Sequence, residues 1–168
     1  MLASLLLALA AAADTCTLPD TEVERQRLLP YAAFDSTPGP HGWRQLNGQG
    51  CTEVAVSLLT AYASANAGRL TSAQDMEIAF HAGQAFAMAG QHQKSIAHFE
   101  RALAPGATPE RRAYVEATLA FLKRDRQALV SARERYATVA PGSMRLRFID
   151  GFLACPDASY VKAVHCRP

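Results

Sequence analysis

Residues 81–90 read His-Ala-Gly-Gln-Ala-Phe-Ala-Met-Ala-Gly, and an amphipathic run that includes Phe99 follows them. In both segments apolar and small residues recur every three or four positions, which is the period of a helix buried on one side. Gly90 separates the two segments, and Pro105-Gly106 ends the second. The stretch therefore predicts two antiparallel helices joined by a tight turn.

Helix start and stop signals recur on both sides of this hairpin. Thr21 with Glu24 matches a capping box and predicts a helix to about residue 31, followed by a Pro/Gly loop at residues 35–40. Further starts are predicted at Thr71 with Gln74 or Ser72 with Asp75, at Thr108-Pro109-Glu110, at Ser143 and, for a short last helix, at Pro156-Asp157. No segment shows the period-two alternation of a strand. We therefore expect an all-α protein of stacked antiparallel helical hairpins.

The small and aromatic residues of the central hairpin resemble those of the tetratricopeptide repeat. That family needs small residues where its two helices approach closely and aromatic residues where they fill the space between helices. The matching positions are Gly83, Phe86, Gly90, Ser95, Phe99 and Ala102. Two departures are Ala79, where the family has a large residue, and Pro105, which comes about two residues early.

The resemblance extends more weakly to both sides. A frame shifted by 33 residues predicts a second, degenerate repeat with Glu116, Leu119, Ala128 and Ala132. Upstream, Trp43-Arg44-Gln45-Leu46-Asn47 resembles the family's opening motif, although its spacing is too short for a full repeat. The resemblance covers roughly residues 41–140 and implies an α-solenoid. A helical pair that merely shares these small residues is the alternative.

The resemblance also implies a binding groove lined by the first helix of each hairpin. By the family's motif, the first repeat contributes Glu77, Phe80, Gln84 and Met88, and the second contributes Glu110 and Ala113, with Ala117 behind them. Such a face suits a peptide with an apolar anchor and a nearby basic residue. The alternative is that Phe80 and Met88 pack on adjacent helices.

The first thirteen residues form an apolar Leu/Ala block that ends in Ala11-Ala12-Ala13 before Asp14. The block is too short to span a bilayer, and its small residues match a signal-peptidase site. It lacks the usual Lys or Arg, so a buried helix is the alternative. We predict a signal peptide at residues 1–13, an N-terminal helix and loop at 14–40, hairpins at 41–140 and a helical cap at 141–168. No later stretch predicts a membrane span, and we expect a periplasmic or secreted protein.

Four cysteines, and no Cys-x-x-Cys pair, are present in the chain. An even number of thiols in an exported protein is typical of disulfides. We favour the pairs Cys16–Cys51 and Cys155–Cys166, because each would tie a terminal segment to the nearest helix. The other pairings and four free thiols stay open, and a metal site at His165-Cys166 lacks ligands at useful spacing.

Neither the charge nor the motifs predict catalysis or nucleic-acid binding. The formal net charge is only +2, and the basic residues between positions 111 and 135 are interleaved with acidic ones. None of the common hydrolase, metalloprotease or phosphate-binding motifs is present. We expect no cofactor and no metal, and a non-catalytic module that binds a protein or peptide in the cell envelope or secreted space. A small envelope enzyme or accessory subunit with an unrecognised site is the alternative.

Overall fold

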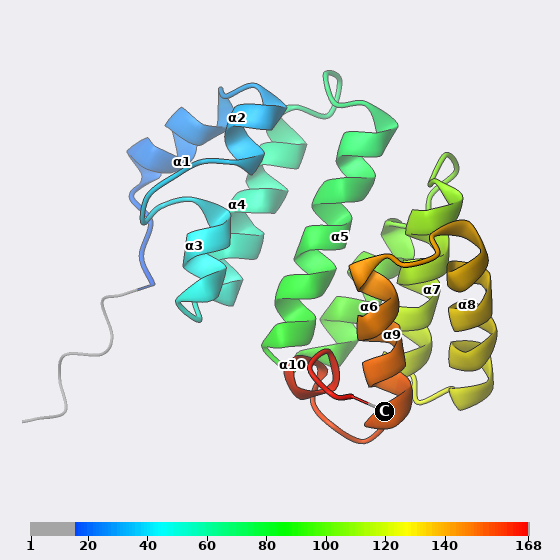
Figure 1. Cartoon of the computed structure of the whole chain (residues 1–168). Coiled ribbons are helices and arrows are strands. Elements are labelled where there is room, and N and C mark those ends of the chain that lie inside the picture. The colour runs from blue at the N-terminus through cyan, green and yellow to red at the C-terminus, as the bar shows by residue number, and fades with distance from the viewer. Residues whose placement is uncertain (1–15, 168) are drawn as a thin grey trace, which may run out of the picture. The chain divides into compact units, whose positions relative to one another are not determined.

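The computed structural model describes residues 16–167, and the predicted signal peptide lies outside this range. Between these limits the chain forms helices and no strand, which confirms the all-α class. The helices are α1 (Asp20–Arg27), α2 (Tyr31–Asp35), α3 (Trp43–Gly48), α4 (Thr52–Ala65), α5 (Ser72–Met88), α6 (His92–Arg101), α7 (Pro109–Leu122), α8 (Arg126–Val139), α9 (Met144–Ala154) and α10 (Tyr160–Ala163). The chain divides into two compact units, with the boundary between Tyr62 and Ala63 inside α4 (Figure 1).

The first unit is held together by an aromatic core and a disulfide. The rings of Phe34 and Tyr62 stack with their centroids 3.7 Å apart, and the Tyr62 hydroxyl donates to the carbonyl oxygen of Leu29 at 2.9 Å. Cys16 and Cys51 form a disulfide, as predicted. The bridge ties the start of the unit to the residue immediately before α4.

The N-terminal capping box is not formed, so the sequence prediction there is wrong. Helix α1 begins at Asp20 with Pro19 at the N-cap, and no side chain caps it. It ends at Arg27 rather than near residue 31, and a separate helix, α2, begins after Pro30. Proline lacks the N–H that a helix interior needs and disfavours helical geometry in the residue before it. Pro30 therefore divides what the sequence reading had treated as one helix.

The second unit consists of the hairpins α5/α6 and α7/α8, followed by α9 and α10. Thr71 and Gln74 form the predicted capping box of α5, and Thr108 caps α7 with Pro109 at its first position. Ser143 caps α9, also as predicted. The last helix differs from the expectation, because Ser159, and not Pro156-Asp157, starts α10.

The turns of the two hairpins lie 34 residues apart, at Gly90 (φ 74°) and Arg124 (φ 59°). Both residues adopt the left-handed conformation that reverses the chain after the first helix. The frame of 33 residues used on the sequence is therefore one residue short. With the corrected frame Ala117 takes the place of Gly83 in the second hairpin, and Leu129 takes the place of Ser95.

Close approach within the first hairpin depends on two small residues. A Cβ atom on Gly83 would lie 3.0 Å from the ring of Phe99, which is buried. The hydroxyl of Ser95 donates to the carbonyl oxygen of Gly83 at 2.8 Å in the buried interface. Larger side chains at either position would separate α5 from α6, which packing at interior density does not allow.

Candidate interaction face

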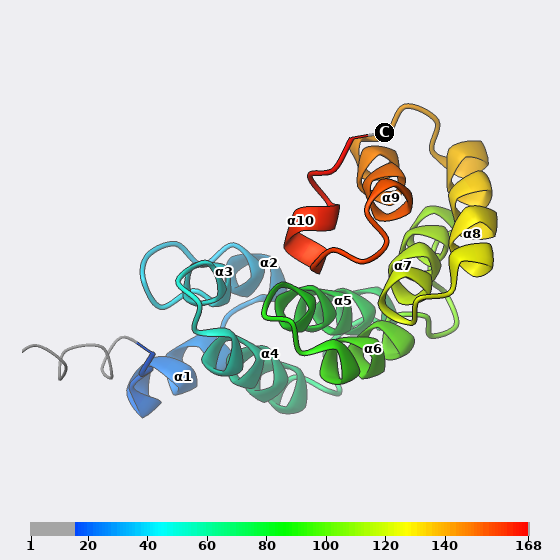
Figure 2. The ribbon, with the colours of Figure 1, turned by 90° about the horizontal axis from the view of Figure 1, so that it is seen from below.

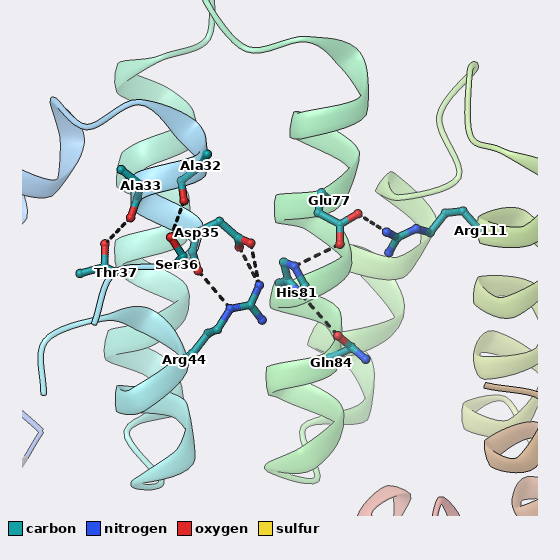
Figure 3. A network of polar contacts seen from close by, with 10 residues as sticks. All are labelled: Ala32, Ala33, Asp35, Ser36, Thr37, Arg44, Glu77, His81, Gln84 and Arg111. Carbon is teal, nitrogen blue, oxygen red and sulfur yellow. Dashed lines mark hydrogen bonds and ion pairs between the residues drawn. The ribbon is translucent and has the colours of Figure 1, made fainter. Parts of the chain in front are cut away.

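Helix α5 carries a polar stripe at the spacing of one helix face. Glu77, His81 and Gln84 follow one another at intervals of four and three residues. Oε1 of Glu77 lies 3.1 Å from Nε2 of His81, and Nδ1 of His81 lies 3.4 Å from Oε1 of Gln84 (Figure 3). Both imidazole nitrogens of His81 are thus engaged by side chains of its own helix.

Arg111 connects this stripe to the first helix of the next hairpin. Its guanidinium forms an ion pair with Glu77, and the same group lies 4.0 Å above the ring centroid of Phe80. Burial opposes ionisation of Glu77, but the hydrogen bond from His81 and the charge of Arg111 outweigh it and hold the Glu77 pKa below its ordinary value. The carboxylate is therefore charged and joins α5 to α7.

Arg145 extends the same surface to α9. Its guanidinium lies 5.4 Å from the ring centroid of Tyr114 and pairs with Glu110 at 3.5 Å. The Tyr136 hydroxyl also donates to Glu110 at 2.9 Å. Because Glu110 is on α7 and Arg145 is on α9, charged groups from three helices meet. We define the α5–α7–α9 face by Glu77, His81, Gln84, Glu110, Arg111 and Arg145.

The structure brings only part of the predicted groove onto this face. Glu77, Gln84 and Glu110 belong to it, whereas Phe80 is 1% exposed and lies in the core beneath Arg111. Its ring contacts Phe99 and Tyr114 with centroid separations of 5.7 and 5.9 Å, so the packing interpretation holds for Phe80.

The other predicted groove residues lie elsewhere in the second unit. Met88 is 46% exposed at the last position of α5, and Ala117 is buried. Ala113 lines a cavity of about 340 Å³ between α7 and α8, together with residues that include Glu116, Arg135 and Val139. These three residues therefore contribute nothing to the charged network of the face.

Two functional residues were missed by the sequence reading. Arg111 directly follows the predicted Glu110, but the family's motif does not select it. Arg145 is on α9, which the predicted domain boundaries placed in a cap after residue 140. The start signal at Ser143 was recognised, and treating α9 as the first helix of a third hairpin would have identified Arg145.

The remaining tests of the sequence predictions concern disulfides, metals and membrane spans. Cys155 and Cys166 are bonded, which confirms the second predicted pair. Over residues 16–167 no group of three or more His, Cys, Asp or Glu residues is arranged to hold a metal ion. None of the helices described is both long and apolar enough to cross a membrane.

Comparison with known proteins identifies no relative. No protein-family model, curated protein or solved structure matches this chain. The chemistry of the face must therefore be argued from its own residues. Both nitrogens of His81 face Glu77 or Gln84, so this pair offers no obvious base to a substrate. The rings and the partly exposed charges are groups that recognise a peptide.

Proposed function

We propose that this chain is a non-catalytic module of tetratricopeptide-like hairpins that binds a protein or peptide in the periplasm or secreted space. One observation carries the proposal: charged side chains of α5, α7 and α9 meet on one face above the buried rings of Phe80 and Tyr114. Two features support the repeat character, namely the 34-residue spacing of the turns and the close packing at Gly83.

The charges of the face are placed so that a partner can exchange with them. Glu110 and Arg145 have side chains 45% and 39% exposed, and their ion pair is 3.5 Å long. Exposed ion pairs of this kind contribute little to stability, about 0 to 1 kcal/mol. A peptide that offers a carboxylate to Arg145 and a basic group to Glu110 replaces this pair at low cost and gains contact with the aromatic layer.

The two disulfides support an oxidising compartment, because such bonds persist outside the cytosol. We propose that residues 1–13 are removed on export. N-terminal sequencing of protein from the extracellular or periplasmic fraction should find a chain that starts at or within a residue or two of Asp14. Alkylation before reduction should label no cysteine in that protein. Soluble protein that retains Met1, or that has four reactive thiols, would contradict the compartment.

The binding function is tested by affinity capture with a matched pair of variants. The mature protein is used as bait on an envelope extract, and the captured species is identified and purified for titration. Arg145→Gln removes a charge of the face, whereas Arg135→Gln removes one from α8 that pairs with Glu116 of α7 at 2.8 Å. Both arginines are half-exposed and each pairs with a glutamate of the same helix.

We expect Arg145→Gln to weaken binding about tenfold, which corresponds to about 1.4 kcal/mol, and Arg135→Gln to leave it unchanged. Thermal unfolding should be the same for both variants within error. Equal effects of the two substitutions, or no captured partner at all, would refute the assignment of the face. Turnover of an envelope substrate by the purified chain would instead support the enzyme alternative.

A further inference from the structure

The α5–α7–α9 face already carries a segment of this same chain. After α9 the chain turns back, and α10 packs against both α9 and α5. Figure 2 shows α10 on the inner side of α5, α7 and α9, opposite to α6 and α8. Residues 155–166 therefore form a loop that covers the part of the face next to Gln84.

Tyr160 anchors this loop. Its side chain is 4% exposed, and its ring centroid lies 5.6 Å from that of Phe152. Its hydroxyl is hydrogen-bonded to Tyr114 and to Gln84, and burial raises the pKa of Tyr160, so the phenol stays neutral. Since Gln84 also bonds to His81, the loop joins the polar stripe of α5.

A second contact is shaped for close approach. Ala163, three residues after Tyr160, is fully buried on α9. A Cβ atom on Gly151 would lie 2.2 Å from the carbonyl oxygen of Ala163, so α10 reaches this position only because residue 151 has no side chain. The opposite side of the loop is open, with Val161 44% exposed.

The Cys155–Cys166 disulfide holds the loop at the face. Its two ends are covalently joined across eleven positions of sequence, so the segment cannot diffuse away. Tethering of this kind gives a local concentration on the order of millimolar. Four helical residues alone could not persist as an isolated helix, so the seat of α10 is the face and the disulfide.

We propose that the loop is an intramolecular ligand, and that the partner competes for the same seat with a helical turn of the same chemistry. That turn carries a tyrosine, a small residue three positions later and a β-branched residue after it, as Tyr160, Ala163 and Val164 do. The inference rests on the proposed function, because it names the class of peptide that the face recognises. The hydroxyl of the tyrosine would bond to Gln84 and Tyr114, and the small residue would lie on Gly151.

A labelled peptide tests the seat directly. The probe is residues 156–167 with Cys166→Ser, which carries a fluorophore and is titrated against the full chain by anisotropy. The receptor is the Tyr160→Ala variant, in which the tethered loop has lost its anchor. We expect it to bind the probe about tenfold tighter than the wild-type chain does, because the intramolecular competitor is weakened.

Two controls isolate the tyrosine contact. The same peptide with Tyr160→Ala should not bind, and a receptor with both Tyr160→Ala and Gln84→Ala should bind the probe several-fold more weakly. If Tyr160→Ala does not fold, the full chain with Cys155→Ser and Cys166→Ser replaces it, because its loop is released at one end. The expected order of affinities is the same.

A probe that binds no folded variant, or that binds equally with and without its tyrosine, overturns the inference. The proposed function is distinguished by the Arg145→Gln capture experiment. Capture that depends on Arg145 while the probe fails leaves the interaction module standing and makes the loop a structural cap only.

Discussion

The substitution Gly151→Ala tests how closely α10 approaches α9. The added Cβ would lie 2.2 Å from the carbonyl oxygen of Ala163 and 3.2 Å from that of Cys166. Both atoms belong to backbone, and the Ala163 oxygen already accepts a bond from the Cys166 N–H at 3.1 Å. The chain can therefore accept the methyl group only if α10 moves outward by about 1 Å, to ordinary contact distance.

The expected magnitude follows from two opposing effects. Overpacking of this kind costs about 1–3 kcal/mol. Alanine in a helix interior recovers up to about 1 kcal/mol relative to glycine. The net loss should be about 1–2 kcal/mol, concentrated in the loop that ends at Cys166, because α9 can keep its contacts with α7 and α8.

Denaturant unfolding and amide hydrogen exchange measure the two parts of this effect. Gly151→Ala should lower the free energy of unfolding and reduce protection at residues 160–166. Gly48→Ala is the matched control: it also lies in a helix, and its new Cβ would meet nothing within 4 Å. The control should be neutral or slightly stabilising. A Gly151→Ala protein as stable and as protected as the wild type would refute the close-approach argument.

Three further predictions concern the core and the pH dependence. Phe80→Ala should cost about 3–5 kcal/mol in denaturant unfolding because its ring is buried, and unchanged stability with lost partner binding would make it a groove residue. Ser95→Ala should cost about 1 kcal/mol in the same assay, and no loss would discount its hydrogen bond to Gly83. Hydrogen bonds from Arg25 and Gln26 lower the Glu22 pKa from 4.5 to about 2, so the stability they give is complete above pH 4.5 and is lost toward pH 2. Glu22→Gln should remove that part of the acid dependence, and identical pH profiles would contradict it.

Local signals in the sequence were sufficient for much of the second unit. Thr71, Thr108 and Ser143 each accept a hydrogen bond from a backbone N–H two or three residues later, so the interaction is contained in one turn of chain. The same kind of signal failed at Thr21, because Pro19 precedes the helix and Pro30 limits its length. A capping motif predicts a helix start only where the neighbouring residues permit it.

Residues distant in the sequence decide the candidate site, and this is why the groove was predicted only in part. By itself the sequence determined the helical class, the hairpin built on Gly83 and Gly90, and the pairing of cysteines with their nearest partners. Only the tertiary structure placed Phe80 in the core, Arg145 beside Glu110 and Tyr160 against Gln84. The physical reason is range: a cap or a turn is decided within a few residues. The face depends on how three helices and a returning loop pack, which no single segment encodes.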